Sequence, residues 1–246
     1  MTIPTVVEMQ EMRENIEDRK LEVHQIVLDH EAAKNVVEKD KTKFFAKLGF
    51  FKPKHGAIEV ESVRLFYEPY MVAKANYLLD YYKNKTYTVK IDDEVCEVIA
   101  FGETFKPEAV KEGRILKRPH KAISFNTQER VIHKAATHMA LNRTGREISP
   151  LRLPDGPTEP EPEKALKKDS EKVRDLQVPS DLILDIIRRR TAKRPPDAGR
   201  IVEEIFEVTE YKLVCTPIYE ARSRQLKTGE IKIIPISGVT GKMLSL

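Results

Sequence analysis

The sequence predicts an α+β fold, in which a long N-terminal helix precedes two similar antiparallel β units with helices between them. Three observations support this prediction. Residues 6–47 contain no Gly or Pro and are rich in strong helix formers. Residues 58–101 and 207–246 alternate apolar and polar side chains, as half-buried strands do. Residues 150–179 carry six prolines among charged residues, which is typical of an extended linker.

Composition restricts the class of protein. A chain of 246 residues with 40% hydrophobic and 33% charged residues suits a folded, soluble protein of one large or two small domains. The chain has two cysteines and no CxxC pair, so no disulfide framework or zinc site is expected. Neither a signal peptide nor an apolar run of about 18 residues is present, and we therefore expect a cytoplasmic protein without membrane insertion.

The expected N-terminal helix carries a possible oligomerisation seam. Its apolar residues recur at alternating steps of three and four, with polar breaks at Arg19 and His30. The apolar members are Met9, Met12, Ile16, Val23, Ile26, Ala33 and Val37. So narrow a seam needs a partner, which is either the same helix of a second copy in a coiled coil or the sheet of its own domain. The first alternative predicts a homo-oligomer.

The two β units share one pattern. In residues 58–101 we expect an antiparallel meander of three to four strands, with Pro69 at a bulge or edge. When Pro217 is aligned on Pro69, Leu213 aligns with Leu65, and strand, kink, strand, hairpin and short strand follow in the same order. This pattern predicts an internal duplication whose copies pack together. The expected parts are a helix (1–48), the first β unit (49–105), a basic mixed insertion (106–149), the linker (150–179), and two helices with the second β unit (180–246).

Helices are expected at three further places. Glu129–His138 has helical character within the insertion. Ser180 or Asp181 can cap a helix through about Arg190, and Pro195 can begin another through Phe206.

No motif for catalysis, cofactor binding or metal binding occurs. GxxxxGK[ST], GxGxxG, HExxH and GxSxG are all missing, and we predict no catalytic, cofactor-binding or metal-binding residue. Gly238–Lys242 superficially resembles a phosphate loop but is expected to be a hairpin turn, because no helix follows it.

Two groups of residues are candidates for contact with a partner. Tyr67, Tyr70, Tyr81 and Tyr82 belong to a tyrosine cluster interleaved with Lys and Arg, which suits sheet packing, protein contact or stacking of nucleic-acid bases. The second group comprises Arg188, Arg189, Arg190, Lys193 and Arg194. These cations suit either a helix C-terminus or phosphate contact. A further basic run covers Lys111–Lys121, within residues 106–150 of net charge +6.

These patterns favour a non-enzymatic, oligomeric interaction or scaffold protein with a macromolecular partner. One alternative is an RNA- or ribosome-associated factor that uses the basic segments. Another is an enzyme with an unrecognised site where the two β units meet.

Overall fold

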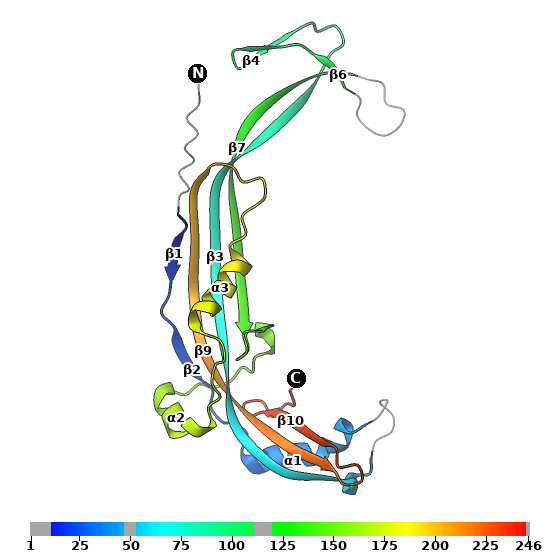
Figure 1. Cartoon of the computed structure of the whole chain (residues 1–246), viewed down its shortest axis with the longest axis vertical. Coiled ribbons are helices and arrows are strands. Elements are labelled where there is room, and N and C mark those ends of the chain that lie inside the picture. Colours follow the sequence, from blue (N-terminus) through cyan, green and yellow to red (C-terminus); the bar gives the residue numbers. More distant parts are fainter. Residues whose placement is uncertain (1–10, 47–52, 111–119, 245–246) are drawn as a thin grey trace. The chain divides into compact units, whose positions relative to one another are not determined.

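The computed structural model describes residues 11–46, 53–110 and 120–244. Contacts between residues divide the chain into two compact units. We call Met1–Glu14, Tyr77–Ala135 and Ala192–Phe206 the ribbon unit, and Asn15–Asn76, Ala136–Thr191 and Glu207–Leu246 the core unit. Three long strands, β3 (Ile58–Ile91), β7 (His120–Leu141) and β9 (Ile201–Gln225), contribute residues to both units (Figure 1).

Strands dominate the fold, so the predicted α+β class with a long N-terminal helix is wrong. The strands form a large mixed sheet in the order β1 (Arg13–Ile16), β9, β3, β7 and β6 (Glu108–Val110). In addition, β2 (Lys20–Val23) and β10 (Ile231–Ser237) pair with β9, and β8 (Glu147–Ile148) pairs with β7. A separate hairpin consists of β4 (Val98–Ala100) and β5 (Glu103–Phe105). No helix among the described residues is long and apolar enough to cross a bilayer.

The region expected to be one helix is helical only over its last part. It contains β1 (Arg13–Ile16), β2 (Lys20–Val23) and a helix, α1, only over His30–Phe44. Asp29 caps α1 by accepting a hydrogen bond of 2.7 Å from the backbone N–H of Ala32. Before Asp29 the chain pairs in parallel with β9, from Lys20↔Lys212 to Val23↔Cys215. Ladder hydrogen bonds and the burial of Val23 outweigh the local helix propensity there.

The predicted duplication of β units is also wrong. Residues 58–91 are the single strand β3, whereas the C-terminal region consists of β9 followed by β10 (Ile231–Ser237). Pro69 lies inside β3 as a buried residue. Strand β7 ends at Leu141, and Ala140 packs against Val72, so Pro69 lies at the limit of the stretch paired with β7. A proline is tolerated at such a position because no partner there requires its N–H.

The helices expected elsewhere are partly replaced by strands. Glu129–His138 belongs to β7, and residues 201–206 begin β9 instead of ending a helix. The described chain has three α-helices: α1, α2 (Pro162–Lys168) and α3 (Ser180–Thr191). Helix α3 covers the span expected from Ser180 to about Arg190. The Pro-rich segment contains α2 and the short 3-10 turns η2 (Pro150–Arg152) and η3 (Ser170–Lys172), and η1 (His55–Ala57) precedes β3.

The core unit is built around β9 and its neighbours. Strand β10 pairs antiparallel with β9, from Ile231↔Arg224 to Ser237↔Ile218. Helix α1 covers this part of the sheet, and a cluster of buried residues joins them: Ala33, Val37, Tyr219, Ala221, Ile234 and Ile236. A second cluster joins β2, β3 and β9 to α2, with Val23, Tyr67 and Cys215 at its centre. Burial of these apolar side chains stabilises the core unit.

The ribbon unit has three main strands at one end and two at the other. Near Tyr77, strand β3 lies between β7 and β9, and Tyr77, Leu79 and Tyr81 form its buried cluster. The loop before β9 pairs with Tyr82 through two backbone hydrogen bonds, to Arg200 O (2.8 Å) and from Gly199 N (2.9 Å). Beyond Tyr82, β3 and β7 continue as a two-stranded ribbon that leads to the β4–β5 hairpin and β6 (Glu108–Val110) (Figure 1).

Candidate interaction surface at the tip of the ribbon unit

The two-stranded ribbon is held together by side chains as well as its backbone ladder. Successive hydrogen bonds join Thr88 to Ser124 (2.9 Å), Thr86 to Asn126 (2.8 Å) and Asn84 to Gln128 (3.4 Å). Later residues of β3 bind earlier residues of β7, so the two strands are antiparallel. An isolated two-stranded ribbon is marginally stable in water, and these cross-strand pairs give it the additional stability it requires.

An aromatic cluster lies where the ribbon meets the small hairpin. Phe125 of β7 is at its centre, and the ring centroids of Tyr87, Phe101 and Phe105 lie 6.1, 5.3 and 6.1 Å from that of Phe125. The Tyr87 ring stacks on Phe125, whereas the other two rings are tilted against it. These contacts pack the β4–β5 hairpin onto one face of the ribbon.

The hairpin turns at Phe101 and Gly102 with an unusual backbone. Ala100 pairs with Glu103, which leaves a two-residue loop whose φ angles are 54° at Phe101 and 77° at Gly102. Positive φ at both positions is typical of a type I′ turn, in which Asn, Asp or Gly is preferred. Phe101 is the only residue other than glycine with positive φ in the described chain. Holding an L-residue with a bulky side chain in this region costs about 1–2 kcal/mol.

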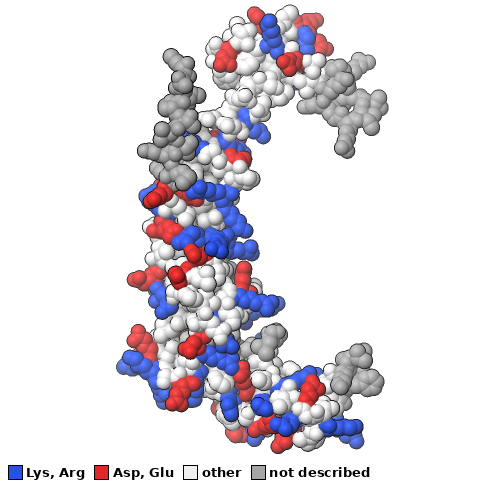
Figure 2. Space-filling model, viewed as in Figure 1, with Lys and Arg blue, Asp and Glu red and all other residues white. Residues whose placement is uncertain are grey.

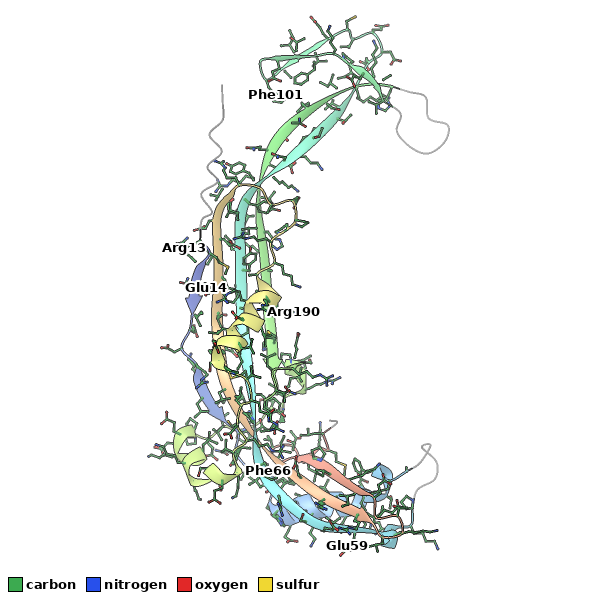
Figure 3. The ribbon with its side chains drawn as sticks, viewed as in Figure 1. Arg13, Glu14, Glu59, Phe66, Phe101 and Arg190 are labelled. Carbon is green, nitrogen blue, oxygen red and sulfur yellow. The ribbon has the colours of Figure 1, made fainter. Side chains whose placement is uncertain are left out.

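Large apolar side chains at this end of the ribbon unit are exposed. Phe101 is 80% exposed and Ile99 is 74% exposed, while Tyr87 and Val89 on the ribbon are each 43% exposed. We call these four residues the apolar tip. Figure 3 shows Phe101 at the β4–β5 turn. Single exposed apolar residues are common on proteins. Here four occur close together in the fold, two on the β4–β5 hairpin and two on the strand β3 that leads to it.

Polar contacts hold the backbone beneath the apolar tip. The Lys121 Nζ donates hydrogen bonds to the carbonyl oxygens of Asp93 (2.5 Å) and Val95 (3.1 Å), which fixes the turn after β3. The Tyr87 hydroxyl donates to the Glu129 carboxylate, and this hydrogen bond raises the pKa of Tyr87. The side chains of the tip therefore project from a fixed frame.

Two ion pairs brace the three-stranded end of the ribbon unit. Arg130 of β7 donates to both carboxylate oxygens of Asp80, at 2.9 Å from its Nε to Oδ1. Glu204 is 4% exposed and accepts hydrogen bonds from Tyr77 Oη (2.6 Å) and Arg194 Nε (2.9 Å). Burial alone would raise the pKa of Glu204, but these hydrogen bonds and the charge of Arg194 lower it.

Most of the predicted basic contact residues have acidic neighbours. Arg194 is bound to Glu204, Arg188 pairs with Asp185, and Arg190 lies 3.7 Å from Glu147. Arg189 and Lys193 are exposed. Figure 2 shows Lys and Arg interleaved with Asp and Glu over the face that it presents. Of the other basic run, Lys111–Arg118 lies outside the described residues.

The four candidate tyrosines do not form one surface. Tyr67 is 3% exposed within the core unit, and Tyr81 is 3% exposed within the ribbon unit. Burial raises the pKa of both Tyr67 and Tyr70 to about 12. The guanidinium of Arg200 lies 4.4 Å from the ring centroid of half-buried Tyr82. Base stacking requires exposed rings, which Tyr67 and Tyr81 do not offer.

The predicted oligomerisation seam loses its basis, because its residues do not share a helix. Met12 packs near the Tyr77–Tyr81 cluster, Ile16 and Ile26 are 41% and 40% exposed, and Val23 is buried beside β9. Ala33 and Val37 lie on α1 but face the sheet of their own unit. Met9 lies outside the described residues.

Groups suited to chemistry are not gathered in one place. Among described residues, no three His, Cys, Asp or Glu side chains are arranged to hold a metal ion. Cys215 is buried, and burial raises the pKa of its thiol to about 11, whereas Cys96 is exposed. Ser237 Oγ accepts hydrogen bonds from the backbone N–H groups of Val239 (3.3 Å) and Thr240 (3.1 Å). These N–H groups of the turn that resembles a phosphate loop are therefore already bound by a side chain of the protein.

The apolar tip was missed by the sequence-based interpretation. Its signal is the pair Phe101-Gly102 between Val98-Ile99-Ala100 and Glu103-Thr104-Phe105, where Gly marks a hairpin and Phe occupies a position that normally holds Asn or Asp. The exposure of Phe101 and Ile99 could not be read from this pattern, because apolar residues in short strands are usually covered.

Comparison with known proteins does not place the chain in a class. No protein-family model, no curated protein and no solved structure matches it.

Proposed function

We propose that this chain is a non-catalytic protein-interaction module, which inserts its apolar tip into an apolar pocket of a folded partner protein. The observation that carries this proposal is Phe101, a large apolar side chain that is 80% exposed on a backbone with φ of 54°. Both features are unfavourable for the chain alone. Asn or Gly at this position would fit the turn without strain and without an exposed ring.

Burial in a partner offsets both costs. An aromatic side chain that enters a fitted pocket commonly contributes 2 kcal/mol or more to binding, by alanine substitution. That gain exceeds the roughly 1–2 kcal/mol of backbone strain at a left-handed residue. Ile99 and Val89 would enlarge the contact, and the aromatic cluster around Phe125 would keep Phe101 oriented before binding.

The segment that carries the exposed side chains is acidic. Residues 89–110 carry six Asp or Glu and two Lys, a net charge of −4. Two of these acidic residues lie close in sequence to the exposed side chains: Glu97 is two residues before Ile99, and Glu103 is two residues after Phe101. A pocket with a basic rim would be complementary to this charge. The basic run Lys111–Lys121 follows directly in the sequence, and the nuclease treatment below separates an RNA partner from a protein partner.

The test compares wild-type protein with Phe101→Asn and with Leu151→Asn in affinity capture from lysate of the source organism. Leu151 is the matched control, because it is 95% exposed and belongs to the other unit. We expect wild type and Leu151→Asn to recover the same protein, and Phe101→Asn to recover at least tenfold less. Benzoylphenylalanine placed at position 99 should cross-link to that protein, and placed at position 151 it should not.

Two results would contradict the proposal. Equal recovery by wild type and Phe101→Asn would show that Phe101 does not contact the partner. Recovery that depends on RNA and disappears after nuclease treatment would favour the alternative of an RNA-associated factor.

A further inference from the structure

Among the described residues, one long edge of the ribbon unit has no strand partner. Strand β7 pairs with β3 on one side, and on the other side with β6 at His120–Ala122 and with β8 at Ala140–Leu141. Between these contacts, no described strand pairs with β7. Within the ribbon unit the open edge runs from Ile123 to Ala135.

An open edge of this length is a site for strand addition. Every second residue of the edge directs both its N–H and its C=O away from β3. Natural proteins often blunt such edges with proline, charged side chains, bulges or very short strands, and this edge carries the charged residues Glu129, Arg130 and Lys134. Residues 123–135 contain no proline or glycine and belong to one uninterrupted strand. The open edge therefore keeps the regular geometry that a second strand requires.

The side chains along the open edge are complementary to themselves. The exposed series is Ser124, Asn126, Gln128, Arg130 and Ile132, and the half-buried series between them is Phe125, Thr127, Glu129 and Val131. A two-fold axis at Gln128 would place Asn126 opposite Arg130 and Phe125 opposite Val131 of a second copy. Thr127 would then face Glu129, and no two like charges would meet directly.

The same register fits the limits of the edge. The pairing of β6 with β7 ends at Ala122, so the backbone of β7 has no described strand partner on this side from Ile123 onward. With the axis at Gln128, the shared ladder runs from Ser124 to Ile132 in each copy. Shifting the axis to Ile132 would bring Arg130 against Lys134, and shifting it to Arg130 would bring that residue against itself. Like charges directly opposite one another destabilise a ladder.

We infer that β7 pairs antiparallel with β7 of a second copy, which makes the chain a two-fold symmetric dimer. A ladder of nine residues per strand supplies about eight to ten hydrogen bonds, similar to the number in a typical interface. Such isologous contacts are the commonest way in which identical chains associate. The surface used is the edge of β7, separate from the apolar tip, so the dimer does not depend on the proposed partner.

Two adjacent proline substitutions test this inference in the full-length chain. Neighbouring residues direct their backbone N–H groups to opposite sides of a strand. Of the variants Thr127→Pro and Gln128→Pro, one therefore removes a backbone hydrogen bond to β3, and the other removes an N–H donor from the open edge. Thermal unfolding and circular dichroism identify the edge variant as the one that retains its fold. Sedimentation equilibrium should give twice the chain mass for wild type and the single chain mass for the edge variant.

A cross-linking experiment tests the register. In a Cys96→Ser background, which removes the exposed native thiol, Gln128→Cys places a thiol on the two-fold axis, where its counterpart lies directly opposite. Mild oxidation should convert this variant into a covalent dimer, whereas Ile132→Cys, expected opposite Ser124, should stay single-chain. A monomeric wild type up to about 100 µM, or a dimer unchanged in the edge proline variant, would overturn the inference.

Discussion

At the scale of single residues, the charged and polar side chains of this protein mostly hold strands together. Glu204 accepts from Tyr77 and Arg194 within the ribbon unit, and Arg174 joins Glu68 to Glu220 within the core unit, at 2.9 and 2.7 Å. His24 is buried, with its Nδ1 3.0 Å from the Thr216 hydroxyl.

Replacing Glu204 by glutamine tests the buried ion pair. The change leaves Arg194 without its carboxylate, and we expect the free energy of unfolding to fall by about 1–3 kcal/mol. The control is Glu203→Gln, because Glu203 is 41% exposed and its pair with exposed Arg13 should contribute little. Urea titrations at pH 7 measure both variants. Equal losses in the two variants would show that burial of Glu204 is unimportant.

The pKa of His24 gives a prediction for acid pH. Burial lowers this pKa, and the nearby carboxylates of Glu22 and Asp155 only partly oppose the effect. Because the unfolded chain takes up the proton more readily, this contribution to stability is complete above the unfolded pKa, about 6.5, and is lost as the pH falls below it. A His24→Gln variant should lose less stability than wild type between pH 7 and pH 5. Denaturant titrations measure the free energy of unfolding at each pH. If wild type and His24→Gln lose equal stability between pH 7 and pH 5, then His24 does not have this role.

At the scale of elements, neighbours decide whether a segment is helix or strand. The sequence from Arg13 to Val23 has good helix formers, yet it lies along β9 as β1 and β2 because the edge of β9 offers unpaired backbone groups. Helix α1 begins only at His30, after Asp29 supplies an N-cap. Its buried face, with Ala33 and Val37, then covers β9 and β10.

The N-cap of α1 can be tested directly. Asp29→Ala removes the acceptor for the Ala32 N–H, and we expect a loss of about 1 kcal/mol in the free energy of unfolding. Asp29→Ser keeps a capping oxygen and should retain most of the stability. If the two variants unfold at the same denaturant concentration, then the cap is not a determinant of where α1 begins.

At the scale of the whole molecule, pairing is largely non-local. Strand β3 pairs with β7 and with β9, and contacts such as Lys74 to Glu210 (2.8 Å) join residues 136 positions apart. Chains whose contacts lie far apart in sequence fold slowly, because long loops must close before the contacts form.

The folding rate follows from this topology. We expect refolding after dilution from urea to take about a second or longer at 25 °C, as in proteins dominated by long-range strand pairing. Stopped-flow fluorescence of the tyrosines measures the rate. Complete refolding within about a millisecond would be the behaviour of a helical bundle and would contradict the strand topology.

Part of this protein was determined by local sequence alone. Ser180–Thr191 is helical, as the helical spacing of its apolar residues indicates, and the alternating segments near Ile58 and Tyr211 are strands. Pattern reasoning located these elements but not their lengths. The alternation predicted three to four strands in residues 58–101, with Pro69 at a bulge or edge, whereas β3 continues without interruption from Ile58 to Ile91.

Tertiary structure decided the rest, for one physical reason: a backbone segment adopts the conformation in which its hydrogen-bonding groups find partners. Glu129–His138 is strand because β3 lies beside it, and β1 and β2 are strands because β9 does. The exposure of the apolar tip also depends on which tertiary neighbours its side chains have. Phe101 is exposed because the ribbon beneath it has only two strands, and nothing in its local sequence distinguishes it from a residue that the chain itself would cover.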